Sequence, residues 1–383
     1  VLRNPGIKII LLVALIVRVI FLLINNYITP LPDSTADAET FEIVAWRLSQ
    51  NGFFDLLNYY KGPDPQFISW LIAVPYSLIG RSMVMAQSIS LLFGIGCVYL
   101  GWKLAYLIWD KPIANKIGWI IALFPSLILY SILVMREVYV CFFLFMALYG
   151  IVSWVKTDKF TYVILALLGF IGATFFHGAM FIGAIIFITI IGLSSIKKII
   201  KSLINFRVNF KIFSYFLFFI ICSGLYLSNK INVPYIDNFR NLTNWDTTLR
   251  KSNLALRGEA SFPEWTRVNH PIELVYKGPA RSIYFVFAPF PWDVKKPSHL
   301  IGMIDAFIYM YLVYLILKNI KTIWRDPSLR VILILLLCYI FVFGVGVGNF
   351  GTGIRHRSKF VIMFLLLAAP LIKKLVFKQP RNE

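Results

Sequence analysis

The sequence predicts an all-α polytopic membrane protein with about 10–11 membrane helices or half-helices. Hydrophobic residues make up 59% of the 383 residues, and the mean hydropathy of +0.75 is unlike that of a soluble domain. Apolar runs of roughly 18 or more residues recur along the chain, and each is long enough to span a bilayer as a helix. The runs are unbroken rather than alternating, which favours helices over barrel strands.

The apolar runs divide the chain into a membrane module (1–228), a polar loop or cap (229–299) and C-terminal membrane helices (300–383). No small-residue cleavage site follows the first run, so we expect it to be retained. The stretch 66–80 is shorter than the others and is a weaker candidate for a span. The expected spans are 7–27, 84–108, 117–135, 138–155, 161–195 as a pair, 212–228, 300–317, 331–347 and 359–373.

Basic residues near the ends of the runs predict the topology, because Lys and Arg favour the cytoplasmic side. Arg3 and Lys8 place the N-terminus inside, so the first loop (28–64) and the larger late loop (229–299) are expected outside. The first loop holds six acidic and two basic residues. If 161–195 is one long helix instead of a pair, the Arg136-Glu137 turn moves to the inside; charge favours the pair. The pair leaves only one crossing between residues 65 and 107, so 66–80 or part of 84–107 would be re-entrant or interfacial.

The formal charge of +20 does not indicate a nucleic-acid partner, because much of it lies in short loops between membrane helices. The four cysteines all lie inside apolar runs, which gives no sign of a disulfide framework or of a thiolate metal site. We expect a multi-pass protein of the bacterial inner membrane with its site facing outside.

An acidic cluster in the first loop is unusual in a chain with 38 Lys and Arg against 18 Asp and Glu. Asp33, Asp37, Glu39 and Glu42 fall within ten residues. Carboxylates at a membrane face can act as a general base, bind a metal or hold sugar hydroxyls. The alternative is an ordinary helix start: Ser34-x-x-Asp37 resembles a capping box, with 41, 44, 45 and 48 on the apolar face of the helix.

Charged residues also interrupt apolar runs. Arg136 and Glu137 break the stretch ILYSILVMREVYVCFFLF, where ionisable groups usually face a cavity or a partner. A surface ion pair in a helix hairpin is the alternative. Arg18 lies in the middle of the first run and is expected to snorkel, to pair with a carboxylate or to bind a phosphate. His177, between two apolar halves, is interpreted as structural.

The motif Arg355-His356-Arg357 follows a glycine-rich turn in GNFGTGIRHRSK. Arginine gives bidentate hydrogen bonds to phosphate, and glycine lets backbone N–H groups approach an anion. A basic cluster that merely flanks the membrane is the alternative, but such clusters favour the cytoplasmic side. Arg257 in the late loop is a weaker candidate. An acidic and a basic patch on the same face suit a sugar linked to a lipid phosphate.

Several of these stretches resemble the GT-C superfamily of polytopic glycosyltransferases and the oligosaccharide repeat-unit polymerases. YYKGPDPQFISW follows the acidic loop as in that superfamily, and FPSLILYSILVMREVYV resembles its "P…S…RE" helix pair. FVFAPFPWD and GNFGTGIRHRSKFVIMFLLLAAP resemble late elements of the polymerase-like members. The resemblance implies a polyprenyl-phosphate- or diphosphate-linked sugar donor, used on the extracytoplasmic side, and a glycan or lipid acceptor.

The resemblance also implies roles for individual residues. Asp33 or Asp37 would be the catalytic base, Arg136 and Glu137 would shape the site, and the late arginines would hold phosphate. The adjacent Asp-Glu pair of protein mannosyltransferases is absent, which leaves the base open between the two aspartates. The candidate site therefore consists of Asp33, Asp37 and Glu137 as catalytic residues and Glu39, Arg136, Arg257, Arg355, His356 and Arg357 as substrate-binding residues.

No cofactor is required by this chemistry, because arginine can neutralise the departing phosphate; the carboxylates would also accept a divalent ion. The expected partners are the substrates and membrane lipids. A nucleic-acid partner is not expected. A transporter or flippase of lipid-linked glycans is the main competing function, although the inverted repeat common in transporters is not evident. A non-enzymatic assembly protein would not need charges converging from distant segments.

Overall fold

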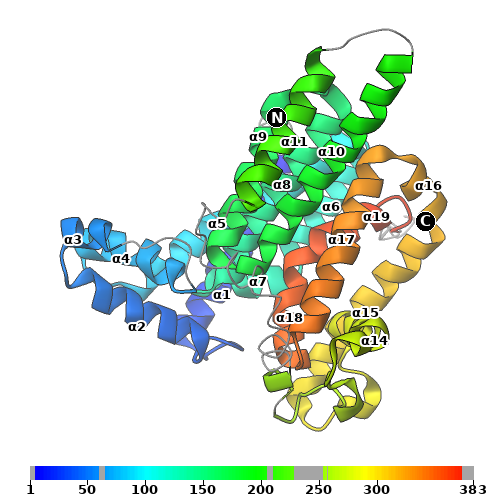
Figure 1. Ribbon diagram of the computed structural model, residues 1–383. Coiled ribbons are helices and arrows are strands. Elements are labelled where there is room, and N and C mark those ends of the chain that lie inside the picture. Colours follow the sequence, from blue (N-terminus) through cyan, green and yellow to red (C-terminus); the bar gives the residue numbers. More distant parts are fainter. Residues whose placement is uncertain (1–4, 60–64, 205–209, 228–252, 257, 373–383) are drawn as a thin grey trace, which may run out of the picture.

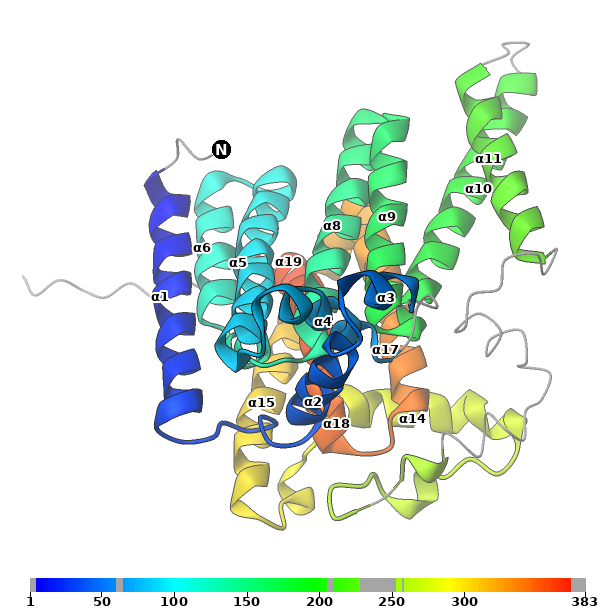
Figure 2. The same ribbon diagram turned by 90° about the vertical axis from the view of Figure 1, so that its left-hand side faces the viewer.

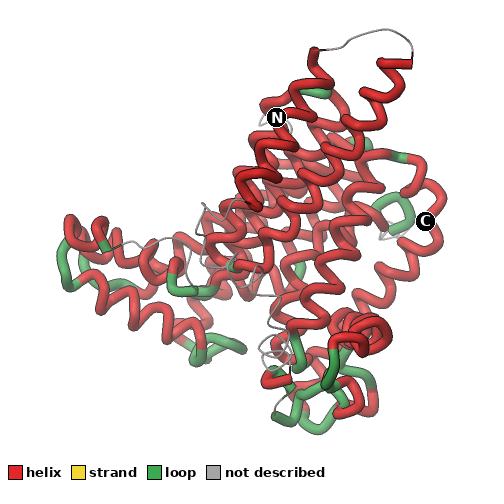
Figure 3. The backbone as a smooth tube through the Cα atoms, in the orientation of Figure 1, coloured by secondary structure: helices red, strands yellow, loops and turns green. Residues whose placement is uncertain are grey.

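The computed structural model describes residues 5–59, 65–204, 210–227, 253–256 and 258–372. These parts are almost entirely helical, and their only β feature is an isolated bridge between Ser261 and Asn349 (Figure 3). Among them, five helices are long and apolar enough to cross a membrane, or six if one bent pair forms a single span. The helical class and the presence of several helices able to span a membrane are confirmed. The count of about 10–11 membrane helices or half-helices stays a prediction.

The long helices run side by side as a bundle (Figures 1 and 2). The N-terminal part of the bundle consists of α1 (Pro5–Tyr27), α5 (Met83–Ile108), α6 (Lys111–Leu123), α7 (Pro125–Ile132), α8 (Arg136–Thr157), α9 (Phe160–Phe176), α10 (Phe181–Ile204) and α11 (Phe210–Leu227). The C-terminal part consists of α15 (Pro297–Lys318), the short α16 (Ile320–Arg325), α17 (Pro327–Gly346), α18 (Phe350–Arg357) and α19 (Val361–Ala368).

The stretch 161–195 is a helix pair, as charge counting predicted. A 3-10 turn, Gly178–Met180, joins α9 to α10. Small residues let α8 and α9 approach closely: a Cβ atom on Gly150 would lie 2.6 Å from the backbone N of Ala166. On the other side of the contact, a Cβ on Gly169 would lie 2.5 Å from the backbone N of Ala147. The pair therefore brings the end of α9 back to the level at which α8 begins.

A lateral lobe of three short helices projects from the bundle: α2 (Asp37–Ser49), α3 (Phe53–Asn58) and α4 (Phe67–Ile79) (Figure 1). Ser69 Oγ donates a hydrogen bond of 2.8 Å to the carbonyl of Phe41, which fixes α4 on α2. Between residues 65 and 107, α5 is unbroken over 26 residues, whereas α4 has only 13 residues. Of the two segments expected to be re-entrant or interfacial, 66–80 is thus the one that fails to form a full-length helix.

The start of α2 corrects one expectation. Ala36 is the N-cap residue and no side chain caps the helix, so the predicted Ser34–Asp37 capping box is wrong. The apolar face is confirmed at Phe41 and Ala45, which are buried. Glu42 is also buried on this face, where it is paired with a basic residue from outside the helix.

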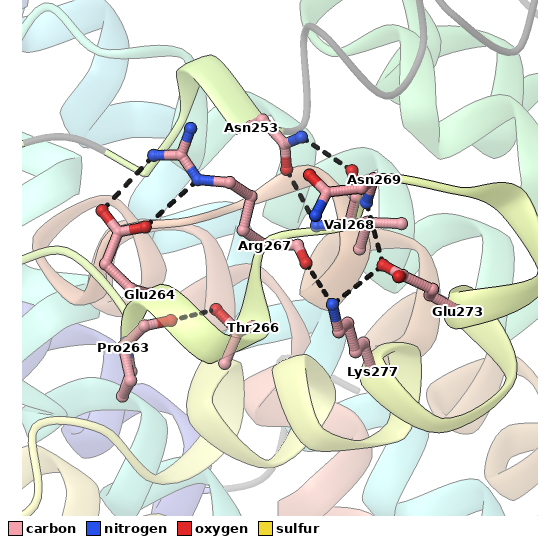
Figure 4. A network of polar contacts seen from close by, with 9 residues as sticks. All are labelled: Asn253, Pro263, Glu264, Thr266, Arg267, Val268, Asn269, Glu273 and Lys277. Atoms are coloured by element: carbon pink, nitrogen blue, oxygen red, sulfur yellow. Dashed lines mark hydrogen bonds and ion pairs between the residues drawn. The ribbon is translucent and has the colours of Figure 1, made fainter.

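The described part of the late loop leads into α14 (Leu274–Phe287), which lies across one end of the bundle (Figure 2). Asn253 holds this segment by accepting from the N–H of Val268 (3.1 Å) and donating to its carbonyl (2.7 Å). Lys277 donates to Glu273 and to the carbonyl of Arg267 (Figure 4). The sequence Asn241-Leu242-Thr243 matches the Asn-x-Thr glycosylation sequon, and it lies outside the described residues.

Three connections gather at the same end of the bundle: 28–36, 133–135 and 347–349. We call this the loop end. Its common location follows from contacts between distant segments, such as Tyr130 with Asp33 and Ser261 with Asn349. Most of the charged residues singled out in the sequence lie here.

Candidate functional site at the loop end

Arg355 is the central residue of the site, and helix α18 positions it. The Asn349 side chain caps this helix by accepting hydrogen bonds from the N–H groups of Gly351 (2.8 Å) and Thr352 (3.3 Å). One helical turn later, Arg355 Nη1 lies 2.5 Å from Asp37 Oδ2, at the first residue of α2. The glycine-rich turn therefore starts a helix that directs a guanidinium group toward the first loop.

Arg355 also meets Glu137, the second residue of α8, with 3.1 Å between Nε and Oε1. Burial alone would lower the pKa of Arg355, but the carboxylates of Glu137 and Asp37 together raise it above its ordinary value. The guanidinium thus stays charged at every accessible pH and joins α2 to α8 by electrostatic attraction.

Glu137 is 1% exposed and surrounded by basic groups. Lys359 Nζ lies 3.5 Å from Oε1, and His356 Nδ1 lies 3.9 Å from it. Nevertheless, neither carboxylate oxygen has a hydrogen-bond partner, because Arg355 approaches at ion-pair distance without hydrogen-bond geometry. A buried carboxylate with open acceptor positions is rare in proteins and marks a place where a ligand or a proton can bind.

His356 and Lys359 form the buried side of this cluster. Lys359 is completely buried, and its Nζ lies 2.7 Å from His356 Nδ1. Burial, with the charge of Lys359, holds the pKa of His356 well below its usual range, so the imidazole is neutral. The ring of His177, at the end of α9, packs edge-on against that of His356 at a centroid distance of 5.1 Å.

Arg136 lies beside this cluster and faces the lateral lobe. Its guanidinium lies over the ring of Phe41 at 5.2 Å, a cation–π contact with α2. Its Nε atom is buried and has no hydrogen-bond partner. Arg136 and Glu137 thus lie between helices, and the simple surface turn that the sequence also allowed does not describe them.

Asp33 is held separately from Asp37. Tyr130 of α7 donates a 3.0 Å hydrogen bond to its Oδ2 atom. The backbone at Asp33 is left-handed, with φ of 62°, a conformation that aspartate tolerates better than most residues. The left-handed turn lets the carboxylate reach α7, away from Arg355.

Asp33 lines a cavity of about 470 Å³ between the first loop, α7, α15 and α18. Its wall is mainly apolar and includes Leu129, Ile304, Ile308 and Ile354. We call this the apolar pocket. Its size lies within the range of roughly 300–1,000 Å³ that is typical of ligand pockets, and a few polar groups interrupt an otherwise hydrophobic lining.

Arg357 has a different environment from Arg355. Its Nε lies 2.7 Å and its Nη2 2.6 Å from Asp305 Oδ2, and its Nη1 donates to the carbonyls of Val286 (2.8 Å) and Ala288 (2.7 Å). Every nitrogen of this guanidinium, which is 1% exposed, is thus engaged within the protein. The arrangement is that of a structural anchor between α14, α15 and α18.

The remaining candidates lie apart from this cluster. Glu39 lines a second, polar cavity behind the first loop. Arg257 lies outside the described residues. Arg18 is buried in α1 and donates to Ser131 Oγ (2.9 Å) and to the carbonyl of Ala122 (2.9 Å), so among the described residues it neither snorkels nor pairs with a carboxylate.

Three residues of the site were not singled out in the sequence: Tyr130, Asp305 and Lys359. Lys359 carried a readable signal, since a lysine just before the long apolar run VIMFLLLAAP lies one helical turn after His356. Asp305 carried one too, as the only charged residue in the expected span 300–317, whereas a tyrosine such as Tyr130 does not stand out in an apolar run. In the part of the chain that is described, no three His, Cys, Asp or Glu residues gather as a metal site.

Comparisons with protein-family models, with curated proteins and with solved structures find no match to this chain.

Proposed function

We propose that this protein is a membrane glycosyltransferase that uses a polyprenyl-phosphate- or diphosphate-linked sugar donor. The reaction would take place on the extracytoplasmic face, in the assembly of a cell-surface polysaccharide or glycoconjugate. One observation carries the proposal: an apolar pocket with a carboxylate in its wall lies against the helix that presents Arg355. In a lipid-linked sugar donor, the tail requires an apolar pocket, the sugar chemistry requires a carboxylate and the phosphate requires a cation such as Arg355.

In this proposal the isoprenoid tail occupies the apolar pocket, and the donor phosphate binds Arg355. The phosphate would displace Asp37, whose side chain is 52% exposed and free to turn toward water. Glu137 stays behind the guanidinium and keeps it oriented, since it is buried and cannot leave. A bidentate guanidinium stabilises the negative charge that develops on the departing phosphate.

Asp33 is the better candidate for the base. Its carboxylate lines the pocket, whereas the carboxylate of Asp37 is already ion-paired. Tyr130 orients Asp33 by donating to one of its oxygens. An acceptor hydroxyl would give its proton to Asp33 as the hydroxyl oxygen attacks the anomeric carbon and the bond to phosphate breaks, with inversion at that carbon.

The extracytoplasmic orientation rests on the distribution of charge in the loops. With it, the bacterial inner membrane is the proposed location. The partners proposed are the lipid-linked donor and a glycan or lipid acceptor.

The test is transfer by the purified protein in lipid nanodiscs, with synthetic polyprenyl-phosphate- and diphosphate-linked sugars as donors. We expect release of the lipid phosphate together with a new glycosidic product. Donor binding without release of phosphate, combined with movement of the lipid between leaflets, would instead support a flippase and contradict the proposal.

A further inference from the structure

The second cavity at the loop end has a lining unlike that of the apolar pocket. Its volume is about 250 Å³, and it lies behind the first loop, between the ends of α1, α2 and α5. We call it the polar pocket. Its hydrogen-bonding side chains are Asn25, Asn26, Ser34, Thr35, Glu39 and Gln87.

Several of these groups have unused hydrogen-bonding capacity. Asn26 Nδ2 donates to Gln87 Oε1 at 2.6 Å, which fixes the Gln87 amide and leaves its Nε2 donors without a partner among the described residues. Ser34 Oγ is buried and also has no partner. The Glu39 carboxylate is exposed, and no described residue pairs with it. Buried polar groups are normally paired in a protein, so the unused capacity of Gln87 and Ser34 is better suited to a ligand than to the empty fold, and Glu39 adds an acceptor at the exposed rim.

The chemistry of the lining defines the ligand class. Amides and hydroxyls can donate to and accept from the hydroxyl groups of a ligand, and the carboxylate can accept from them, whereas no Lys or Arg is among the described residues that line this pocket. The ligand is therefore neutral and rich in hydroxyls. The volume falls below the range of roughly 300–1,000 Å³ for pockets of drug-sized ligands, which suits one sugar ring better than a chain.

The two pockets share a wall. Pro32 and Asp33 line the apolar pocket, whereas Ser34 and Thr35 line the polar one. The left-handed backbone at Asp33 turns the chain at the boundary between these two pairs of residues. A ligand in the polar pocket would thus contact Ser34, the residue that follows the proposed base in the chain.

We infer that the polar pocket binds the terminal sugar ring of the acceptor, as a neutral glycoside. The identification of this sugar as the acceptor rests on the proposed function, but the binding of a neutral sugar can be measured without any transfer. Glu39 and Gln87 hold ring hydroxyls, and Ser34 completes the contact beside the shared wall.

Binding is tested first without a donor. Saturation-transfer NMR on the purified full-length protein would use methyl glycosides of hexoses, 6-deoxyhexoses and N-acetylhexosamines, with hexose 6-phosphates as the anionic comparison. We expect at least one neutral glycoside to bind and the phosphates to bind at least about tenfold more weakly, because Glu39 repels them and no cation compensates. Failure of every neutral glycoside to bind, or preference for the phosphates, would overturn the inference.

Variants locate the binding in the pocket. Glu39→Gln and Ser34→Ala should each weaken the glycoside by about tenfold, the scale of one lost hydrogen bond to a polar ligand. Thr35→Trp should block the pocket from its exposed rim without disturbing the core. The matched control is Asp55→Asn, a loss of one exposed carboxylate in α3 of the same loop region, which should leave binding unchanged.

The transfer assay separates this inference from the proposed function. If transfer occurs, Glu39→Gln should raise KM for the acceptor and leave KM for the donor lipid unchanged. If no transfer occurs but glycosides bind and the variants abolish binding, the pocket is established and the enzymatic proposal fails. If transfer occurs and neither binding nor acceptor KM responds to the three variants, the acceptor binds elsewhere and the inference is wrong.

Discussion

Arg355 and Asp37 form an ion pair across 318 residues of sequence, with 2.5 Å between Nη1 and Oδ2. The pair joins the start of α2 to the end of α18. Because Glu137 contacts the same guanidinium, this arginine connects the first loop, the middle of the chain and its C-terminal part. The pair also makes the first loop and the arginine motif neighbours on one face of the protein.

The first prediction concerns membrane orientation. The contacts of Arg355 place the first loop and α18 at one end of the bundle, whereas α8, with 22 residues, reaches roughly 30 Å away from it to Lys159. Single cysteines would replace the exposed residues Asp55, Thr352 and Lys159 in a background without the four native cysteines. In intact cells, an impermeant thiol reagent should label positions 55 and 352 but not 159. The reverse pattern would contradict the extracytoplasmic site.

The second prediction concerns the base. Asp33→Asn should reduce transfer by at least about a thousandfold while donor binding stays within about twofold, because the amide keeps the shape but accepts no proton at neutral pH. Asp37→Asn should retain measurable transfer, since Glu137 still holds Arg355. Asp55→Asn is the control. Normal turnover in the Asp33 variant, with loss in the Asp37 variant, would reverse the two assignments.

The third prediction concerns phosphate binding. Arg355→Lys keeps the charge but loses the bidentate fork, so donor binding should weaken by about 1–3 kcal/mol, the range for a charged hydrogen bond. The measurement is the Kd of the polyprenyl-phosphate sugar in nanodiscs. Arg267→Lys is the matched control, because that arginine is paired with Glu264 on an exposed segment. Equal affinities in wild type and Arg355→Lys would place the donor phosphate elsewhere, with Arg136 as the next candidate.

The fourth prediction separates Arg357 from Arg355. Arg357→Met should lower the free energy of unfolding by about 3–5 kcal/mol, because it leaves Asp305 as an uncompensated, largely buried charge. Combining it with Asp305→Leu should restore much of that loss. Thermal unfolding in detergent is the readout. An unchanged melting temperature together with lost donor binding would show that Arg357 holds phosphate, as the sequence motif predicts.

The fifth prediction concerns acid stability of the lateral lobe. Arg81 binds both oxygens of Glu42 (2.9 and 2.7 Å) and, with Tyr76, holds the pKa of that carboxyl below its ordinary value, although burial opposes this. The depressed pKa means that the stabilisation is present above the unfolded value of about 4.3 and is lost as the pH falls through the folded value. Glu42→Gln should therefore lower the melting temperature at pH 7, and the difference from wild type should shrink below pH 4. Glu264→Gln, at an exposed pair, should show neither effect. A difference that stays constant with pH would mean that Glu42 contributes through packing alone.

The apolar runs of this sequence determined its class, because a chain that is 59% hydrophobic can satisfy its backbone in a membrane only as helices or a barrel. Charge counting also predicted that α9 and α10 are a pair, which puts His177 beside His356. The acidic first loop, Arg136, Glu137 and Arg355 were all recognisable, since charged residues stand out against apolar surroundings.

The tertiary structure alone decided what each charge does. Arg355 and Arg357 look equivalent in the motif, yet two helical steps turn them roughly 200° apart. One therefore faces the first loop, and the other is buried against Asp305. The local sequence of α18 carries no trace of that difference, because it depends on which distant carboxylate the fold brings to each side of the helix. The same holds for Asp33 and Asp37, which are four residues apart: the left-handed backbone at Asp33 directs one to Tyr130, while the other meets Arg355.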